Sequence, residues 1–445
     1  MTVPASPRPF AVTHRSVVAI ALPMTLAYLT TPIVGFADTA VVGRLGDAAL
    51  LGGIAVAAIL FDLVATTFGF LRMGTGGLTA QAFGAGDRVE ERAVLVRSLG
   101  LGVVVGLAVL AAGGPLVAAF LWVMGASPAV EAAARDYAAI RFLAMPFTFV
   151  NFAVLGWVVG LGRARLGLAL QVFLNALNVA LNLWLALGLG WGLAGVAWAT
   201  VAAEVAAAFA GLAAVAVVTR GGAWPDLTRL LDRTAILRLL GVNRDIMIRS
   251  VVLMAAFVFF TAQGARGSDV VLAANAILMN FFMLGALFLD GFAAAAEQLA
   301  GRAVGARWRP AFARAVALSI GWGLVFGAAA SLVLLVVGPP LIDVVTTAEA
   351  VRAEARTFLP WAAATPIVAS LAFVLDGVYI GATWTRAMRD RMLVAFAGYL
   401  ALWALLDPLL GNHGLWIALL GFLALRGITL ALPLRRRLDV TFGPG

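Results

Sequence analysis

The 445-residue sequence contains neither cysteine nor lysine, and only 12% of its residues are charged. The absence of cysteine excludes disulfides, thiolate metal sites and cysteine nucleophiles. The absence of lysine excludes a Walker A phosphate-binding loop and a Schiff-base lysine, so the chain carries no ATP-hydrolysing motor of its own. The two histidines, His14 and His413, lie near the ends of apolar stretches, and no nucleophile–base pair stands out. An enzyme would need such a set, so we expect no catalytic residues.

Hydrophobic residues make up 63% of the chain, and apolar stretches of about 20 residues recur from one end to the other. No soluble domain could bury that much apolar surface, so the composition predicts an all-α polytopic membrane protein. The stretches predict twelve spans, near 16–43, 51–83, 94–123, 133–160, 167–188, 192–219, 240–264, 270–300, 314–338, 354–381, 391–410 and 414–433. The second and eighth are too long for one perpendicular crossing and are expected to tilt or to extend into the cytoplasm. The first residues, MTVPASPRPFAVTHRSVV, lack a small-residue cleavage site before a short apolar core, so no removable signal peptide is expected.

All 31 basic residues are arginines, and most of them lie in loops, unevenly distributed between alternate loops. One set of loops holds 21 arginines and the opposite set holds 5. Because cytoplasmic loops carry the excess of basic residues, both termini are expected in the cytoplasm, with an even number of spans. The formal charge of +9 is therefore interpreted as an orientation signal, which needs no nucleic-acid partner.

The segment between the sixth and seventh spans, GGAWPDLTRLLDRTAILRLLG, predicts a cytoplasmic interfacial helix that joins two halves. Pro225 and Asp226 are typical of a helix start. The leucines and Ile236 fall largely on one helical face, and the arginines occupy the other. We therefore expect an N-terminal six-helix lobe over 1–219, a linker over 220–239 and a C-terminal six-helix lobe over 240–445.

The two halves repeat at a constant separation in the sequence, which we call the repeat offset. Gly156-x-x-x-Gly160 recurs as Gly377-x-x-x-Gly381, and Arg165 recurs as Arg386 at the same offset. The turn at 83–86 matches the one at 304–307, while Gly46-Asp47 matches Ser268-Asp269 one position out of step. Six spans per half is an even number, so both halves keep the same orientation. Their pseudo-two-fold axis is then expected along the membrane normal, with any central site between the lobes.

Seven of the acids in the predicted spans are candidates, because a carboxylate there costs roughly 2.5–3.5 kcal/mol even on the lenient insertion scale and is a functional-site hypothesis by default. They are Asp38, Asp62, Glu204, Asp290, Glu297, Asp376 and Asp407. Asp38 lies shortly before Arg44, so a snorkelling or arginine-paired acid is the alternative to a functional one. Pro23 and Pro32 interrupt hydrogen bonding in the same predicted helix, which could therefore bend. Asp407 lies near an outer helix end, where capping or solvent contact explains it.

The fifth predicted span contains three asparagines, Asn175, Asn178 and Asn182. Asn178 and Asn182 have i, i+4 spacing, so both amides project from one helical face. Asparagines in a bilayer often serve only as hydrogen-bonding partners between helices, worth under ~1 kcal/mol each. Opposite an acid, the pair suits a site where a bound proton or cation changes the hydrogen bonding. Glu204, in the middle of the sixth span, either joins this site or is a neutral, hydrogen-bonded acid.

In the second half, Asp376 is the strongest acid candidate because it directly precedes the repeated Gly377. Asp290 and Glu297 have i, i+7 spacing and share a helical face. Arg72, in the matching span of the first half, could neutralise one of them across the interface between the halves, and this structural pairing is the favoured interpretation. All three are also candidates for lining a substrate cavity. The many Phe, Trp and Met residues suit an apolar, adaptable cavity, although lipid-facing aromatics are expected in any such protein.

The chain resembles the multidrug and toxic compound extrusion (MATE) family, in its DNA-damage-inducible (DinF-like) branch. The resemblance rests on ALPMTLAYLTTPIVGFADTAVVGRLGD, FGFLRMGTGGLTAQAFGAGD, Asn178-x-x-x-Asn182, GRAVGA at 301–306 and LDGVYIGATWTRAMRD at 375–390. These matches are spread over both halves. The resemblance implies twelve helices in two six-helix lobes and the export of organic compounds in exchange for H⁺ or Na⁺. It also implies that Asp38 is the coupling acid of the first lobe and Pro23 the bend in the first helix, with Asn178, Asn182 and Thr200 at the polar positions around the acid.

Two departures from the family pattern favour protons over sodium. Many members carry an aspartate where this chain has Asn182, so a sodium cage loses one charge here. The second-lobe sodium site of another branch pairs an aspartate, matching Asp376, with a glutamate on the seventh helix. In this chain the seventh helix, VVLMAAFVFFTAQG, has no acid.

These patterns together predict an inner-membrane antiporter that exports amphipathic organic compounds by alternating access. We expect a monomer that uses an H⁺ gradient, or a Na⁺ gradient, and needs no cofactor. The alternative is a flippase or exporter of lipid-linked or acidic metabolites with the same architecture. Arg72 and Arg141 would serve an anionic substrate of that kind.

Overall fold

The computed structural model describes residues 7–44 and 46–443. Over those residues the regular secondary structure is helical, and twelve helical stretches are long and apolar enough to cross a membrane. The all-α fold class and the twelve predicted spans are therefore confirmed for the described part of the chain. The predictions that concern residues 1–6, 444 and 445, including the extreme ends of the two lobes and the placement of both termini, lie outside the described residues.

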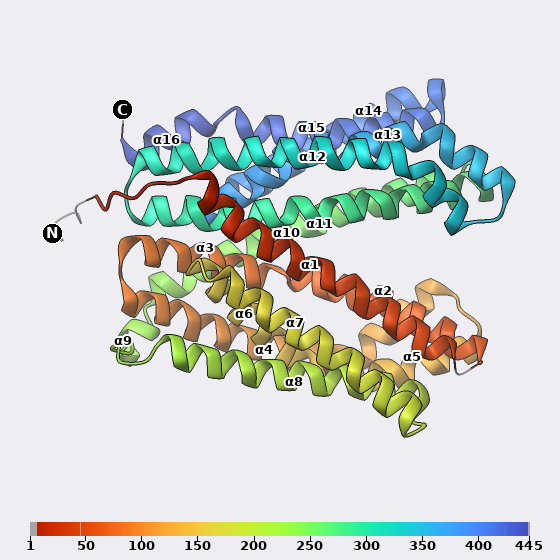
Figure 1. The fold of residues 1–445 in the computed structure, drawn as a ribbon, viewed down its shortest axis with the longest axis horizontal. Coiled ribbons are helices and arrows are strands. Elements are labelled where there is room, and N and C mark those ends of the chain that lie inside the picture. Colours follow the sequence, from red (N-terminus) through yellow and green to blue (C-terminus); the bar gives the residue numbers. More distant parts are fainter. Residues whose placement is uncertain (1–6, 45, 444–445) are drawn as a thin grey trace. The chain divides into compact units, whose positions relative to one another are not determined.

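Each predicted span corresponds to one helix or to consecutive helical segments (Figure 1). The first six spans consist of α1 (His14–Gly43), α2 (Ala48–Phe68) with α3 (Phe70–Ala85), α4 (Arg88–Met124), α5 (Pro128–Arg141) with η1 (Phe142–Ala144) and α6 (Met145–Gly160), α7 (Ala164–Asn182) with η2 (Leu183–Gly188), and α8 (Gly192–Val218). The last six consist of α9 (Leu227–Leu230) with α10 (Arg233–Gly264), α11 (Asp269–Gly305), α12 (Arg309–Val345), α13 (Glu349–Gly381), α14 (Thr385–Leu410), and α15 (Asn412–Ala431) with α16 (Leu434–Phe442).

The two spans expected to exceed one crossing differ in structure. The second is divided at Gly69 into α2 and α3, whereas the eighth, α11, is a single helix of 37 residues. At 1.5 Å per residue such a helix is about 55 Å long. A hydrocarbon core is about 30 Å thick, so α11 must tilt or extend beyond it.

Internal contacts divide the chain into two compact units. The N-terminal unit comprises Leu26–Phe83 and Asp87–Asn243, and the C-terminal unit comprises Met1–Thr25, Gly84–Gly86 and Arg244–Gly445. The divisions at 25/26 and 243/244 fall inside α1 and α10 rather than in loops. Because each of these helices belongs to both units, the lobe boundaries expected at 219 and 240 stay a prediction.

The internal repeat is visible in matching backbone contacts. A Cβ added at Gly156 would lie 2.2 Å from the Arg72 carbonyl oxygen, and one added at Gly377 would lie 2.1 Å from the Ala293 carbonyl oxygen. The two glycines are separated by the repeat offset, and so are their partners. A second pair of contacts matches in the same way. A Cβ added at Gly160 would meet the Gly76 carbonyl oxygen, and one added at Gly381 would meet the Glu297 carbonyl oxygen. The glycines permit helix–helix contact too close for a side chain, and this contact is present in each unit.

The repeat also accounts for two unusual loop residues. Gly86 and Gly162 have left-handed backbones, with φ of 68° and 74°. Their counterparts at the repeat offset, Arg307 and Thr383, keep positive φ values of 51° and 54°. Among the described residues these are the only two non-glycine residues at positive φ, a conformation that costs an L-residue roughly 1–2 kcal/mol. The turns therefore have the same geometry in both halves, even where a residue with a side chain occupies them.

The linker does not form the continuous amphipathic helix expected from its sequence. Asp226 caps α9 as expected, by accepting a hydrogen bond from the Arg229 N–H (2.9 Å), but α9 is only four residues long. The chain then turns, and α10 begins at Arg233 and runs unbroken into the seventh span. Asp232 starts this second helix by accepting a hydrogen bond from the Thr234 N–H (2.8 Å). The position of the linker at the cytoplasmic membrane surface stays a prediction.

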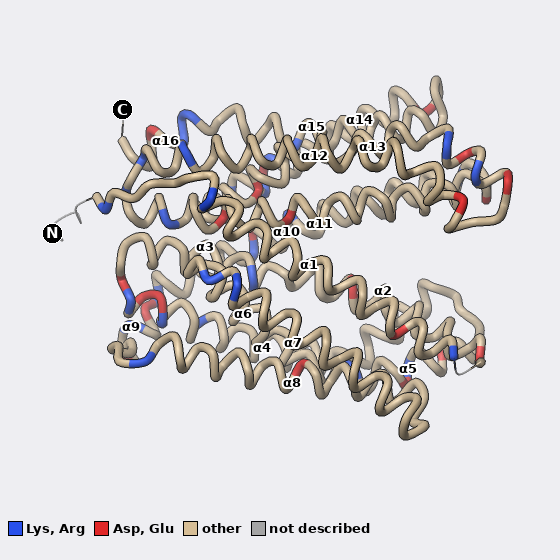
Figure 2. The backbone as a smooth tube through the Cα atoms, viewed as in Figure 1, with Lys and Arg blue, Asp and Glu red and all other residues tan. Residues whose placement is uncertain are grey.

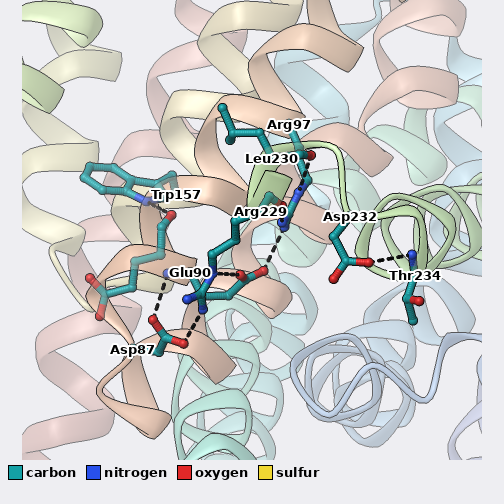
Figure 3. A network of polar contacts seen from close by, with 9 residues as sticks. Asp87, Glu90, Arg97, Trp157, Arg229, Leu230, Asp232 and Thr234 are labelled. Carbon is teal, nitrogen blue, oxygen red and sulfur yellow. Dashed lines mark hydrogen bonds and ion pairs between the residues drawn. The ribbon is translucent and has the colours of Figure 1, made fainter. Parts of the chain in front are cut away.

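The short helix α9 is held against the start of α4 by a charged network, which Figure 3 shows. The Arg229 guanidinium pairs with Asp87 and with Glu90, the latter at 3.1 Å. Glu90 also pairs with Arg97 (2.7 Å), whose side chain is 6% exposed and donates to the carbonyl oxygens of Leu230 and Arg229. A network of shared charges stabilises more than isolated surface pairs do. The linker is thus fixed to the N-terminal unit.

Candidate functional site

Most charged residues lie toward the helix ends, and comparatively few lie along the spans (Figure 2). Asp38 is one of those few, and it is buried within α1. Its Oδ1 accepts a hydrogen bond from Nδ2 of Asn182. The same Asn182 nitrogen donates to Oδ1 of Asn178 (3.0 Å), and Nδ2 of Asn178 donates to Oγ1 of Thr200 (3.0 Å). The structure therefore joins four of the predicted site residues in one chain of hydrogen bonds.

The end of α7 positions the two amides. Asn178 and Asn182 are both buried and project from the same helical face, as their spacing predicted. Asn182 is the last residue of α7, and Leu183–Gly188 continue as a π-helical turn. Turns of this kind are rare and frequently occur at functional sites. Nearer the start of α7, Asn175 donates to Oγ1 of Thr30 in α1 (2.6 Å), so two levels of the α1–α7 contact are polar.

A partly buried arginine, Arg141, lies beside this site, a position that the sequence did not predict. Arg141, at the end of α5, donates to the Tyr137 hydroxyl (2.7 Å) and lies over the Phe61 ring, 4.7 Å from its centroid. Its guanidinium interacts electrostatically with both Asp38 and Glu204. From the sequence, Arg141 was expected only to serve an anionic substrate. The one feature that marks it is its position inside a predicted span. The structure places its positive charge near the candidate coupling acid.

Glu204 has a hydrogen-bonding partner of its own. Its Oε2 accepts a hydrogen bond from Nδ2 of Asn151 (2.7 Å), and the same nitrogen donates to the Glu204 carbonyl oxygen (3.0 Å). Whether Glu204 joins the Asp38 site or is a neutral, hydrogen-bonded acid stays a prediction. Glu204 and Asp38 share Arg141 as an electrostatic partner.

The residues that correspond to this site in the second half are aromatic. At the repeat offset, the counterparts are Phe259 for Asp38, Tyr399 for Asn178 and Trp403 for Asn182. If the one-position shift at Ser268 is applied, Phe260 replaces Phe259 as the counterpart of Asp38. The Phe259 ring packs edge-on against Tyr399 (5.5 Å between centroids) and Trp403 (5.0 Å). Rings therefore meet in the C-terminal unit where an acid and two amides meet in the N-terminal unit.

Asp376, the strongest acid candidate of the second half, is buried between two arginines. Arg249 of α10 and Arg426 of α15 each donate from Nη2 to Oδ2 of Asp376, the second at 2.7 Å. Two guanidinium groups beside the carboxylate repel a sodium ion. Both arginines lie inside predicted spans, far from Asp376 in sequence, so the sequence does not connect them with this acid.

Helix α10 also corrects the expectation that the seventh helix lacks an acid. The stretch VVLMAAFVFFTAQG has none, but α10 begins earlier and includes the buried Asp245. Its Oδ1 pairs with Arg389 (2.8 Å) and with Arg244 (3.1 Å). The span predicted over 240–264 already contains Asp245, which lies just before the acid-free stretch 251–264.

The remaining charged candidates lie on α3 and α11. Arg72 lies over the Tyr28 ring, 5.5 Å from its centroid, in the N-terminal unit. In the C-terminal unit Asp290 interacts electrostatically with Arg426, and Glu297 is buried. The pairing of Arg72 with either acid, and a role for the three in lining a substrate cavity, stay predictions.

Helix α1, which carries Asp38, runs without interruption through Pro23 and Pro32. A proline inside a helix removes one main-chain hydrogen bond and costs about 3 kcal/mol or more. Near Pro32, the Thr30 hydroxyl donates to the Ala27 carbonyl oxygen (2.6 Å). Bending at the two prolines stays a prediction.

A buried acid in a helical membrane protein of two repeated halves is typical of secondary transporters. The family model MatE matches residues 23–184 and 246–409. The chain therefore belongs to the MATE family of membrane transporters.

Similar proteins include curated relatives and solved structures. DNA damage-inducible protein F of Escherichia coli (strain K12) is 39% identical over 427 residues, which cover 94% of this chain and 91% of that protein. Probable multidrug resistance protein NorM of Caulobacter vibrioides is 27% identical over 429 residues, which cover 93% of this chain and 86% of that protein. A structure described as the outward-facing conformation of a multidrug resistance MATE family transporter of the MOP superfamily matches with a TM-score of 0.86 at 19% identity, covering 96% of each chain. That match shows the shared fold.

Proposed function

We propose that this protein exports amphipathic organic compounds from the cytoplasm across the inner membrane in exchange for protons. It would work by alternating access, as a monomer with both termini in the cytoplasm, without a cofactor or catalytic residues. The observation that carries the proposal is the hydrogen-bonded chain from Asp38 through Asn182 and Asn178 to Thr200.

Proton binding at Asp38 would change the hydrogen bonding along this chain. The charged carboxylate accepts the bond from Asn182. Protonation removes a buried charge and weakens the acceptor, because bonds to charged groups are stronger than bonds to neutral ones. Helix α1 is then held less firmly to α7, and Pro23 and Pro32 give it places to bend.

The chemistry of the site favours protons over sodium. A sodium ion needs several oxygen ligands with compensating negative charge, and Asn182 contributes an amide where a second carboxylate would serve better. Arg141 adds a positive charge that interacts with Asp38 and opposes a metal cation. A proton needs only one acceptor oxygen, which Asp38 supplies.

One proton per cycle supplies enough free energy for useful export. A proton moving down 100 mV supplies about 2.3 kcal/mol, and each pH unit adds about 1.4 kcal/mol. Since every 1.4 kcal/mol is about a factor of ten, one titrating acid could sustain a substrate gradient of roughly 10²–10³.

Transport by the purified protein in proteoliposomes tests the choice of ion. We expect an imposed pH gradient to drive export of an amphipathic organic substrate, and a sodium gradient alone to be ineffective. Robust sodium-driven uptake at clamped pH and membrane potential would refute the proton proposal.

The second candidate function is a flippase or exporter of lipid-linked or acidic metabolites. The buried Arg249 and Arg426 favour it, because two guanidinium groups share a single carboxylate oxygen.

A further inference from the structure

We propose that Arg249 and Arg426 form a binding site for the carboxylate of an organic acid, with Asp376 as an internal competitor for the same donors. The inference rests on the proposed transport function for its biological meaning, and it names a substrate class for that function. All three residues of this site belong to the C-terminal unit. Asp38, Asn178 and Asn182 belong to the N-terminal unit and are not part of it.

Hydrogen bonding within the triad is incomplete. Arg249 and Arg426 both donate to Oδ2 of Asp376, so two guanidinium groups share one acceptor atom. Among the described residues, Oδ1 of Asp376, Nε of Arg249 and both Nε and Nη1 of Arg426 have no hydrogen-bond partner. A guanidinium group carries five N–H donors in a rigid fork and cannot lose its proton in a protein. The triad therefore has more donors than Asp376 alone can satisfy.

Burial makes these unsatisfied donors costly. Arg426 is 1% exposed, Arg249 is 7% exposed and Asp376 is 4% exposed. Buried donors without partners lose their hydration without compensation. Asp290 adds an electrostatic attraction to Arg426, but the Nε and Nη1 groups of Arg426 still lack acceptors.

The geometry of the donors indicates a carboxylate. Guanidinium groups bind carboxylates through two parallel N–H···O bonds, made by Nη2 together with either Nε or Nη1. A carboxylate at Arg426 would accept from one of the two unpartnered donors and from Nη2, the nitrogen that now donates to Asp376. The guanidinium lies beside the rings of Phe373 and Phe422, with 5.7 and 5.6 Å from Cζ to the centroids. An acid with an aromatic body matches both the donors and these rings. A cationic ligand is disfavoured by the two positive charges.

A purely structural triad is the competing explanation, since buried ion pairs also occur as packing elements. The two explanations differ in the expected effect of Asp376→Asn. If Asp376 competes with a ligand, the substitution frees both guanidinium groups and tightens carboxylate binding. If the triad is only structural, the substitution lowers stability and leaves carboxylate binding unchanged.

Equilibrium dialysis of the purified full chain in non-ionic detergent, at neutral pH and without any gradient, measures this binding. The probes are radiolabelled naphthoate and its neutral counterpart naphthamide. We expect the wild type to prefer naphthoate, Asp376→Asn to bind it more tightly, and Arg426→Gln to bind it at least about tenfold more weakly, the effect of losing one charged hydrogen bond. Arg435→Gln, the same change at an exposed arginine of α16, is the matched control and should bind as the wild type does.

Two results would overturn the proposal. One is the absence of a naphthoate preference in both the wild type and Asp376→Asn. The measurement on Asp376→Asn decides the question even if Arg426→Gln does not fold. The other is displacement of naphthoate by short-chain phosphatidylglycerol at lower concentration than by unlabelled naphthoate, which would assign the arginines to a lipid headgroup. Because the binding needs no gradient, its failure would leave proton-driven export untouched, and a failure of proton-driven export would leave the binding result standing.

Discussion

The Asn182 amide of α7 donates a hydrogen bond to the buried Asp38 carboxylate of α1. At the corresponding positions of the second half, the rings of Trp403 and Phe259 pack edge to face. At this pair of positions, therefore, the N-terminal unit has a contact that can respond to a proton, and its counterpart in the C-terminal unit is apolar packing. We infer that ion coupling belongs to the N-terminal unit, while the buried arginines give the C-terminal unit a different chemistry.

Replacing Asn182 by aspartate should make the transporter responsive to sodium. Asn182→Asp sets a second carboxylate beside Asp38, which restores the charge that a sodium cage needs. We expect sodium-driven uptake by this variant at clamped pH and voltage, and none by the wild type. Asn175→Asp is the control, because Asn175 bonds Thr30 and not Asp38. An Asn182→Asp protein that stays indifferent to sodium would show that charge at this position does not select the ion.

Removing the positive charge of Arg141 should impair coupling. Arg141→Gln leaves Asp38 and Glu204 without their shared counter-charge, and we expect substrate-driven proton movement to fall at least about tenfold, the equivalent of about 1.4 kcal/mol. Arg141→Lys keeps the charge and should retain part of the rate. A pH-sensitive dye inside proteoliposomes measures the flux, with the exposed Arg135→Gln on the same helix as control. Wild-type flux in Arg141→Gln would remove Arg141 from the coupling site.

The repeated glycine contacts should matter equally in both halves. Gly156→Ala and Gly377→Ala each push a methyl group against a backbone carbonyl, so each should destabilise the protein by about 1–3 kcal/mol. Gly100 and Gly321 are also separated by the repeat offset, but a Cβ at either meets nothing within 4 Å. Their alanine variants should be neutral or more stable by about 0.5–1 kcal/mol. Thermal unfolding in detergent distinguishes the two pairs, and equal effects at all four positions would speak against the repeated contact.

The spans, the repeat and the Asp38 site could be predicted because each leaves a local mark in the sequence. Hydrocarbon requires about 20 apolar residues per crossing, and an acid such as Asp38 stands out against that background. The spacing of Asn178 and Asn182 shows that they share a face without any knowledge of neighbouring helices. The glycine motifs at Gly156 and Gly377 carry the repeat offset directly.

The partners of Asp376 and the environment of Asp38 could not be predicted in the same way. Which side chains meet depends on how each helix is rotated and tilted, and packing sets both. Arg249 and Arg426 lie 127 and 50 residues from Asp376 in sequence, so no local pattern connects them. The division of the linker could not be predicted for a different reason. Its leucine pattern suits one helix, but the Asp232 cap divides the segment into α9 and α10.

The central claim, that Asp38 couples proton movement to export, is tested most directly by proton–substrate exchange in proteoliposomes containing Asp38→Asn. The substitution keeps the size of the side chain and removes the titrating group, so the variant should fold and insert normally but lose proton-driven export. Asp407→Asn, the same change at an acid of α14, should export nearly as the wild type does. If Asp38→Asn still exchanges substrate for protons at the wild-type rate, the assignment is wrong, and Glu204 or Asp376 becomes the leading candidate.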